Sequence, residues 1–205
     1  DKTSPLLADL LAFIAQDGCS DDEFDQFALR LFAHQYEANA PFRSFCQRRG
    51  AAPRKVRAWS DIPAVPIDAF KIMELRSAPA SSAERVFMTS GTTGQPARGR
   101  HFHPGLEVYD LSMTRNFAQR FMGADRRLPM GVLFFDERDM PNSSLAHYLS
   151  LARREFGTPD SGHFFSSAGL DLPGLCAALD KAERSGQPYA LLGASFGFVH
   201  LMDAL

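Results

Sequence analysis

Six consecutive small or hydroxyl-bearing residues stand near the middle of the sequence, directly after an apolar run. Residues 89–94 read Thr-Ser-Gly-Thr-Thr-Gly. Glycine lets the backbone turn sharply and approach a ligand closely, and backbone N–H groups in such a turn form a concave site for phosphate oxygens. The hydroxyl groups add hydrogen-bond donors that can adjust to several phosphates. We therefore predict a phosphate-binding loop made of Thr89, Ser90, Gly91, Thr92, Thr93 and Gly94.

Two better-known phosphate-binding motifs do not fit this loop. The P-loop requires a lysine directly after its last glycine, and no lysine follows Gly94. The dinucleotide fingerprint Gly-x-Gly-x-x-Gly is also absent from the sequence. The alternative is an ordinary polar hairpin turn, since Ser, Thr and Gly are common in loops. An unbroken run of six such residues just after a strand favours the phosphate site.

Basic side chains follow the loop and could neutralise a bound anion. Arg98 and Arg100 carry planar guanidinium groups suited to phosphate. We predict that they bind the anion; the alternative is that both are surface charges. His101 and His103 have the spacing of a metal pair, but no third histidine or carboxylate cluster has matching spacing. We therefore expect no metal site here and expect these histidines to contact the anion.

A second group of small residues lies near the end of the sequence. Gly193 and Ser195 follow a predicted strand, and small residues at the carboxyl end of a strand often line a ligand crevice. The letters Gly193-Ala-Ser-Phe-Gly197 also match the nucleophile motif of serine hydrolases. A hydrolase needs an acid and a histidine later in the chain. Of these, only His200 and Asp203 follow the serine, and they are implausibly close to it.

Alternating strand and helix patterns predict the elements that must position these groups. Residues 1–58 read as a helical lead-in, in which Ser20 and Glu23 form a capping box and Phe24 lies on the buried face of the helix. Residues 59–205 predict an α/β fold, a layered sheet with flanking helices. Two prolines three apart make residues 59–71 extended rather than helical. Strands are predicted at 85–89, 130–135 and 189–192, and helices at 104–122, 143–156, 173–185 and 196–205.

The composition limits the class of protein. The 205 residues are 45% hydrophobic with a formal net charge of −2, so nothing global indicates nucleic acid or an anionic membrane as a partner. Three scattered cysteines suit a reducing compartment, and no apolar stretch approaches the roughly 20 residues of a membrane span. We therefore expect a cytoplasmic protein. The sequence starts without methionine or a signal peptide and ends inside a helical pattern, so we expect it to be trimmed.

One segment has a local charge imbalance. Between Pro41 and Ser60 there are six basic residues and no acidic one. Two interpretations remain open, namely a solvated basic face and a docking patch for an acidic partner or an anionic cofactor. The basic residues are Arg43, Arg48, Arg49, Arg54, Lys55 and Arg57.

Several of these segments together resemble a known family. Ser-Gly-Thr-Thr-Gly-Gln-Pro at 90–96 resembles the phosphate-loop signature of adenylate-forming enzymes. The flanks narrow the likeness, because they are similar to LuxE-like acyl-protein synthetases, with phenylacetate-CoA ligases as more distant relatives. The flanking segments are Ile62–Lys71, Arg98–His103 and Leu191–Phe196.

The resemblance implies the N-terminal domain of an adenylate-forming enzyme and a two-step reaction. A carboxylic acid, most simply a fatty acid, reacts with ATP and Mg²⁺ to give an acyl-adenylate, and a thiol then takes the acyl group. The thiol belongs to a protein cysteine, coenzyme A or a carrier protein, and an acyl reductase is a further partner. The resemblance also places Gly193 and Ser195 beside the acyl site, and His147 is expected to bind substrate there. The alternatives are a phenylacetate-CoA-ligase-like enzyme and a non-catalytic binding module.

The sequence departs from the family pattern in two ways. Ala97 occupies the place where most of the superfamily has a lysine. The later motifs, including the adenine-holding segment, the ribose-binding aspartate and the catalytic lysine of the mobile lobe, cannot be placed before Leu205. Cys19, Cys46 and Cys176 do not match the setting of the acylated cysteine. We therefore assign no catalytic residue and expect this chain to be incomplete for catalysis.

Overall fold

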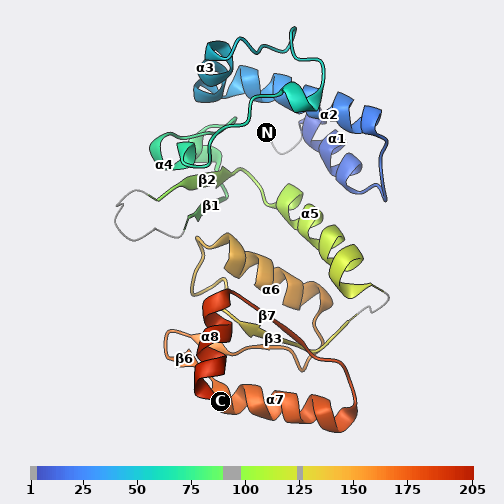
Figure 1. Ribbon diagram of the computed structural model, residues 1–205, viewed down its shortest axis with the longest axis vertical. Helices are drawn as coiled ribbons and strands as arrows, with labels where there is room; N and C mark the ends of the chain where they lie inside the picture. The colour runs from blue at the N-terminus through green and yellow to red at the C-terminus, as the bar shows by residue number, and fades with distance from the viewer. Residues whose placement is uncertain (1–3, 90–97, 124–126) are drawn as a thin grey trace. The chain divides into compact units, whose positions relative to one another are not determined.

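The structure is a computed structural model that describes residues 4–89, 98–123 and 127–205 (Figure 1). The chain divides into two compact units, Asp1–Leu106 and Glu107–Leu205, here called unit 1 and unit 2. The boundary expected at residue 58 stays a prediction. Both units contain helices and strands, which confirms the expected mixed α/β class, although the sheets are small.

Unit 1 begins with three helices, of which the second and third pack around a small aromatic core. The predicted capping box is present, because the backbone N–H of Glu23 donates to Ser20 Oγ (3.2 Å) and that of Ser20 donates to Glu23 Oε2 (2.8 Å). Phe24, expected on the buried face, is 44% exposed and makes a T-shaped ring contact with Trp59. The core consists of Phe32, Phe42, Cys46 and Val56. The helices are α1 (Pro5–Ile14), α2 (Asp21–Ala38) and α3 (Ala40–Arg48).

The rest of unit 1 leads into an antiparallel strand pair. The extended segment predicted at 59–71 contains a 3-10 turn and a short helix at its two ends, so the extended prediction holds only around the prolines. Strand β1 pairs with β2 so that Met88 lies opposite Arg100. The elements are η1 (Trp59–Asp61), α4 (Ala69–Ile72), η2 (Ala80–Ser82), β1 (Arg85–Met88) and β2 (Arg100–His103).

Unit 2 contains a three-stranded parallel sheet in the order β4-β3-β7. The predicted helix at 104–122 runs on as a π-helical turn, where the N–H of Gly123 donates to the carbonyl of Ala118 at 3.1 Å. The elements are α5 (Glu107–Phe117), η3 (Ala118–Met122), β3 (Met130–Leu133), α6 (Ser144–Phe156), β4 (Gly162–His163), β5 (Phe165–Ser166), β6 (Gly169–Leu170), α7 (Leu172–Ser185), β7 (Ala190–Gly193) and α8 (Ser195–Ala204).

The central strand β3 is covered on both faces, which explains why it is apolar throughout. Met130 packs in a cluster with residues of α5 and α6, whereas Leu133 points to the other face and packs with Leu175 of α7 and Leu201 of α8. Figure 1 shows α6 and α7 on opposite sides of the strands. Within the described ranges, no helix is both long and apolar enough to cross a membrane.

Candidate functional site

The predicted phosphate loop connects β1 to β2. Ser90, Gly91, Thr92, Thr93 and Gly94 lie outside the described residues. Thr89 and Gly99 on either side of them form two hydrogen bonds: the N–H of Thr89 donates to the carbonyl of Gly99, and the N–H of Gly99 donates to Thr89 Oγ1, each at 3.0 Å. Both ends of the connection are therefore held together, and the Thr89 hydroxyl keeps its own proton for donation.

Gly99 packs closely against helix α4. A β-carbon at this position would lie 3.1 Å from the carbonyl oxygen of Phe70 and 3.2 Å from Thr89 Cγ2, so only glycine fits without displacing its neighbours. The ring of Phe70 stacks on His101 with a centroid separation of 4.2 Å. Gly99 was not predicted as a site residue, although it lies between the two predicted arginines in the sequence.

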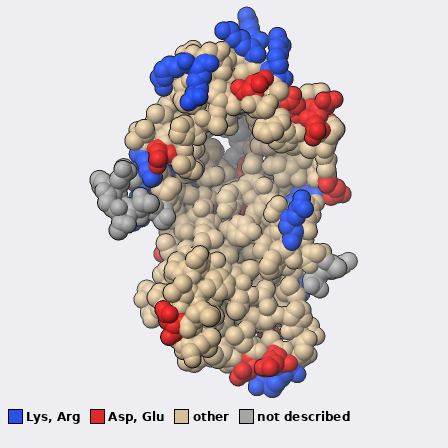
Figure 2. Space-filling model, in the orientation of Figure 1, with Lys and Arg blue, Asp and Glu red and all other residues tan. Residues whose placement is uncertain are grey.

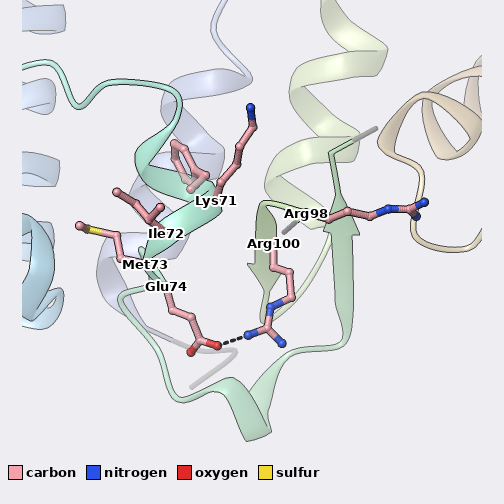
Figure 3. Close-up of a pocket in the computed structure, with 7 residues that line it drawn as sticks. Lys71, Ile72, Met73, Glu74, Arg98 and Arg100 are labelled. Carbon is pink, nitrogen blue, oxygen red and sulfur yellow. Dashed lines mark hydrogen bonds and ion pairs between the residues drawn. The ribbon is translucent and has the colours of Figure 1, made fainter. Parts of the chain in front are cut away.

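A cavity of about 300 Å³ lies beside this junction (Figure 3). Three cationic side chains and one carboxylate line it together with apolar groups. This excess of positive charge suits an anionic ligand. The lining residues are Phe70, Lys71, Ile72, Met73, Glu74, Arg98 and Arg100.

The two predicted arginines have different surroundings. Arg100 Nη2 lies 2.5 Å from Glu74 Oε1, and Arg76 Nε donates to the other oxygen of Glu74 at 3.1 Å. Arg98 is exposed and has no ion-pair partner among the described residues. Figure 3 shows its side chain pointing away from the Glu74–Arg100 pair. Arg98 is therefore the arginine of the two that can bind an added anion without first breaking an ion pair.

Lys71 is a third cation that sequence reasoning did not assign to the site. Its Nζ lies 2.9 Å from Asp68 Oδ1, and the aspartate is exposed at the surface. A single ion pair of this kind is weak in water, so Lys71 remains able to exchange Asp68 for a bound anion. The signal in the sequence was its position at the end of the Ile62–Lys71 segment.

The two histidines of β2, His101 and His103, were expected to contact the anion, but they are not among the residues that line the cavity. They alternate with Arg100 along the strand and face the apolar side, where His103 lies 5.1 Å from the ring of Phe87. Burial lowers the pKa of His101 below its ordinary value. Packing on phenylalanine leaves the His101 imidazole less available to an anion, and anion contact by these histidines stays a prediction.

In unit 2, Gly193 ends β7 and Ser195 begins α8. β-Carbons at Gly193 and Gly197 would lie 2.8 Å and 2.2 Å from the carbonyl oxygen of Leu133 on the neighbouring strand. Both glycines therefore allow the strand and helix to pack closely. Ser195 itself is exposed at the carboxyl edge of the sheet.

The hydrolase alternative is not supported by this geometry. A hydrolase nucleophile stands on a sharp, strained turn between strand and helix. Among the described residues no amino acid other than glycine has positive φ, so Ser195 lacks such strain. His200 packs its ring against Phe165 at 5.6 Å.

His147 is 4% exposed and lies between two carboxylates. Its Nδ1 is 2.6 Å from Glu137 Oε2 and its Nε2 is 2.7 Å from Asp110 Oδ1. Arg154 lies 3.3 Å from the other oxygen of Glu137. These contacts join three parts of the chain, namely α5, α6 and the segment that follows β3. They occupy both ring nitrogens of His147. Substrate binding by His147 stays a prediction.

A second histidine lies at the carboxyl edge of the sheet. His163 Nδ1 is 3.2 Å from the carbonyl oxygen of Phe134, so this nitrogen carries a proton, while Nε2 lies 3.5 Å from Asp136 Oδ2. Burial lowers the pKa of His163, and nearby arginines contribute to the decrease. Burial alone would raise the pKa of Asp136, but hydrogen bonds from Arg138 outweigh it and lower that pKa.

Because the folded state disfavours protonation of His163, stability is expected to fall on acidification. The unfolded chain takes up a proton on this side chain near its ordinary pKa of about 6.5, and the folded chain does so at lower pH. Chemical denaturation from pH 7.5 to 5.5 measures the loss. His163→Asn, which keeps a donor for the Phe134 carbonyl, is expected to have a shallower decline. Identical slopes in the two proteins would contradict this assignment.

The fold and the site define the class as a mixed α/β protein that holds a hydroxyl- and glycine-rich segment between two strands. The family model for LuxE acyl-protein synthetases matches residues 8–150, more than half of the sequence. The chain therefore belongs to the LuxE acyl-protein synthetase family. The matched range includes the predicted phosphate loop, Arg98, Arg100 and His147, and it ends before β7. A comparison with curated proteins found no match.

Proposed function

We propose that this chain takes part in the ATP-dependent activation of a carboxylic acid, most simply a fatty acid, followed by transfer of the acyl group to a thiol. Membership of the acyl-protein synthetase family supports the general activity. The single observation that carries the nucleotide assignment is the cationic cavity beside a loop whose two ends are hydrogen-bonded to each other.

In the first step of the proposed reaction, negative charge develops on phosphate oxygens. A carboxylate oxygen attacks the α-phosphorus of ATP, the bond to pyrophosphate breaks, and acyl-adenylate forms. A thiolate sulfur then attacks the acyl carbon, which releases AMP and leaves a thioester. Fixed cations near the phosphates stabilise the charge that develops in the first step. Mg²⁺ is commonly held through substrate phosphates and would add to this stabilisation.

The residues present fit the phosphates of ATP. In the proposed site Arg98 contacts a phosphate directly, because it is exposed and has no ion-pair partner among the described residues. Arg100 positions the start of β2 through its ion pair with Glu74. Lys71 supplies a further charge from α4. Most of the superfamily has a lysine at the position of Ala97, and Arg98 would replace the charge of that lysine.

Replacing Arg98 with alanine is expected to reduce carboxylate-dependent exchange of labelled pyrophosphate into ATP about tenfold to thirtyfold. This matches the loss of one charge-assisted hydrogen bond, about 1.5–2 kcal/mol. The full-length protein is assayed with a panel of aliphatic and aromatic acids. Arg98→Lys is expected to retain part of the rate, and Arg120→Ala, an exposed arginine of unit 2, to retain all of it. Equal rates in Arg98→Ala and the unaltered protein would refute the role of Arg98.

The same assay separates the alternatives. Exchange only with aromatic acids, followed by thioester formation on coenzyme A, would favour a phenylacetate-CoA-ligase-like enzyme. ATP binding in calorimetry without exchange would favour a non-catalytic module. We propose that the acceptor thiol belongs to a protein cysteine, to coenzyme A or to a carrier protein. An acyl reductase is the proposed further partner. The scattered cysteines favour a cytoplasmic location, which we also propose.

A further inference from the structure

The basic segment found in the sequence lies at the surface of unit 1. Figure 2 shows lysine and arginine side chains gathered over the part of unit 1 that carries α3. Five of the six are exposed, and Arg43 is half-buried. We call this set the basic surface, and its residues are Arg43, Arg48, Arg49, Arg54, Lys55 and Arg57.

The charges of the basic surface are not neutralised within the described part of the chain. None of its members has an ion pair there. Elsewhere exposed cations do have partners, as Arg30 has in Asp9 (2.5 Å) and Lys181 has in Asp160 (2.6 Å). The chain as a whole carries a net charge of −2, so the imbalance is local. Such a surface attracts an anionic partner.

The backbone that carries the basic surface packs on the core of unit 1. Phe42 and Cys46 of α3, together with Val56, are buried in the core beneath them. The guanidinium group of Arg49 lies over the ring of Phe45 at 4.7 Å. A surface carried on a packed backbone loses less conformational entropy when it binds than a flexible segment does.

An exposed aromatic pair adjoins the basic surface. Trp59 follows Arg57 by two residues, is 56% exposed, and lies edge-on to Phe24 with ring centroids 5.8 Å apart. Its backbone N–H donates to the Asp25 carboxylate, which fixes its position. Tryptophan and arginine are the residues most enriched among those that dominate the binding energy of protein interfaces.

The chemistry of the surface favours a protein partner over a lipid or a nucleic acid. Five of its six cations are arginine, which pairs bidentately with carboxylates and is enriched in protein interfaces, where lysine is depleted. The apolar side of α3 is already used in the core, so that face is not left to enter a bilayer. The sequence pI of about 6.3 is far below that of typical nucleic-acid-binding domains.

We propose that the basic surface, with Trp59 at its border, is a docking site for a folded protein that presents a cluster of aspartate and glutamate side chains. The arginines pair with these carboxylates, and Trp59 packs against an apolar group among them. This docking does not depend on ATP or on acyl transfer, so the proposal stands or falls separately from the proposed function.

Trp59 is the single tryptophan of the sequence, so its fluorescence reports directly on this surface. The full chain is titrated with a designed helical peptide rich in Asp and Glu with one leucine stripe. We expect a shift of tryptophan emission to shorter wavelength and a binding constant that weakens as salt rises. Arg48→Glu combined with Arg54→Glu is expected to weaken binding at least tenfold. Arg120→Glu combined with Arg184→Glu, an equal charge change at exposed sites of unit 2, is expected to leave it unchanged.

Two further probes test the choice of partner. Vesicles containing phosphatidylserine and a 20-base-pair DNA duplex are titrated under the same conditions. Weaker binding of both than of the acidic peptide supports the proposal. Equal or tighter binding of either probe would overturn it, as would equal weakening by the two pairs of charge reversals.

Discussion

Replacing His147 with leucine is expected to lower the free energy of unfolding of unit 2 by about 2 kcal/mol, the scale for removing a buried hydrogen-bonding group from its partners. The imidazole separates Asp110 from Glu137 and hydrogen-bonds to both. Leucine fills most of the volume but leaves the two carboxylates facing an apolar side chain. Glu137 retains a cation, Arg154, whereas Asp110 has no ion pair with a cation other than His147 among the described residues. The loss is measured by denaturant unfolding of the full chain, with hydrogen exchange to locate it in α5 and α6.

The same network provides its own control. Adding Asp110→Asn to His147→Leu removes one of the stranded charges, so the double variant is expected to regain part of the lost stability. His200→Leu, at an exposed position of α8, is expected to change stability by less than about 0.5 kcal/mol. If His147→Leu were as stable as His200→Leu, the network would be a surface contact without structural importance.

Gly197→Ala is expected to destabilise unit 2 by about 3 kcal/mol, although alanine favours a helix over glycine by about 1 kcal/mol. The added methyl group would lie 2.2 Å from the carbonyl oxygen of Leu133. That oxygen belongs to the backbone of the central strand, so relief requires α8 to move away from β3. Thermal unfolding followed by circular dichroism measures the effect.

The neighbouring serine gives a matched comparison for Gly197. Ser195→Ala changes an exposed residue in the first turn of the same helix and is expected to leave the melting temperature nearly unchanged. A rise in stability for Gly197→Ala, as helix propensity alone predicts, would show that α8 packs less tightly on β3 than the structure indicates.

Local signals in the sequence predicted local structure well. The capping box at Ser20 and the end of the helix predicted at 173–185 depend on residues that are close in the sequence, and the structure contains both. The strand at 85–89 was predicted from its apolar run and is confirmed as Arg85–Met88. These elements need no information about distant parts of the chain.

Contacts between distant residues were not predictable in the same way. Asp110 and His147 are 37 positions apart, and no periodic pattern links them. Phe24 followed a helical period, yet its side chain is 44% exposed beside Trp59. His101 was assigned to the anion because it follows the loop, but strand alternation turns it toward Phe70. In each case the tertiary partner decided the outcome.

The π turn at the end of α5 has a consequence for how the chain tolerates changes in length. Phe117 and Met122, five positions apart, are 4% and 3% exposed and belong to the same core cluster. In an α-helix each added residue rotates everything beyond it by about 100°. The π turn contains one residue more than an α-helical turn, so the side chains of Phe117 and Met122 both reach the core. Deletion of a single residue within 118–121 would therefore be accommodated as a regular helix, whereas an equal deletion earlier in α5 would turn its buried face toward solvent.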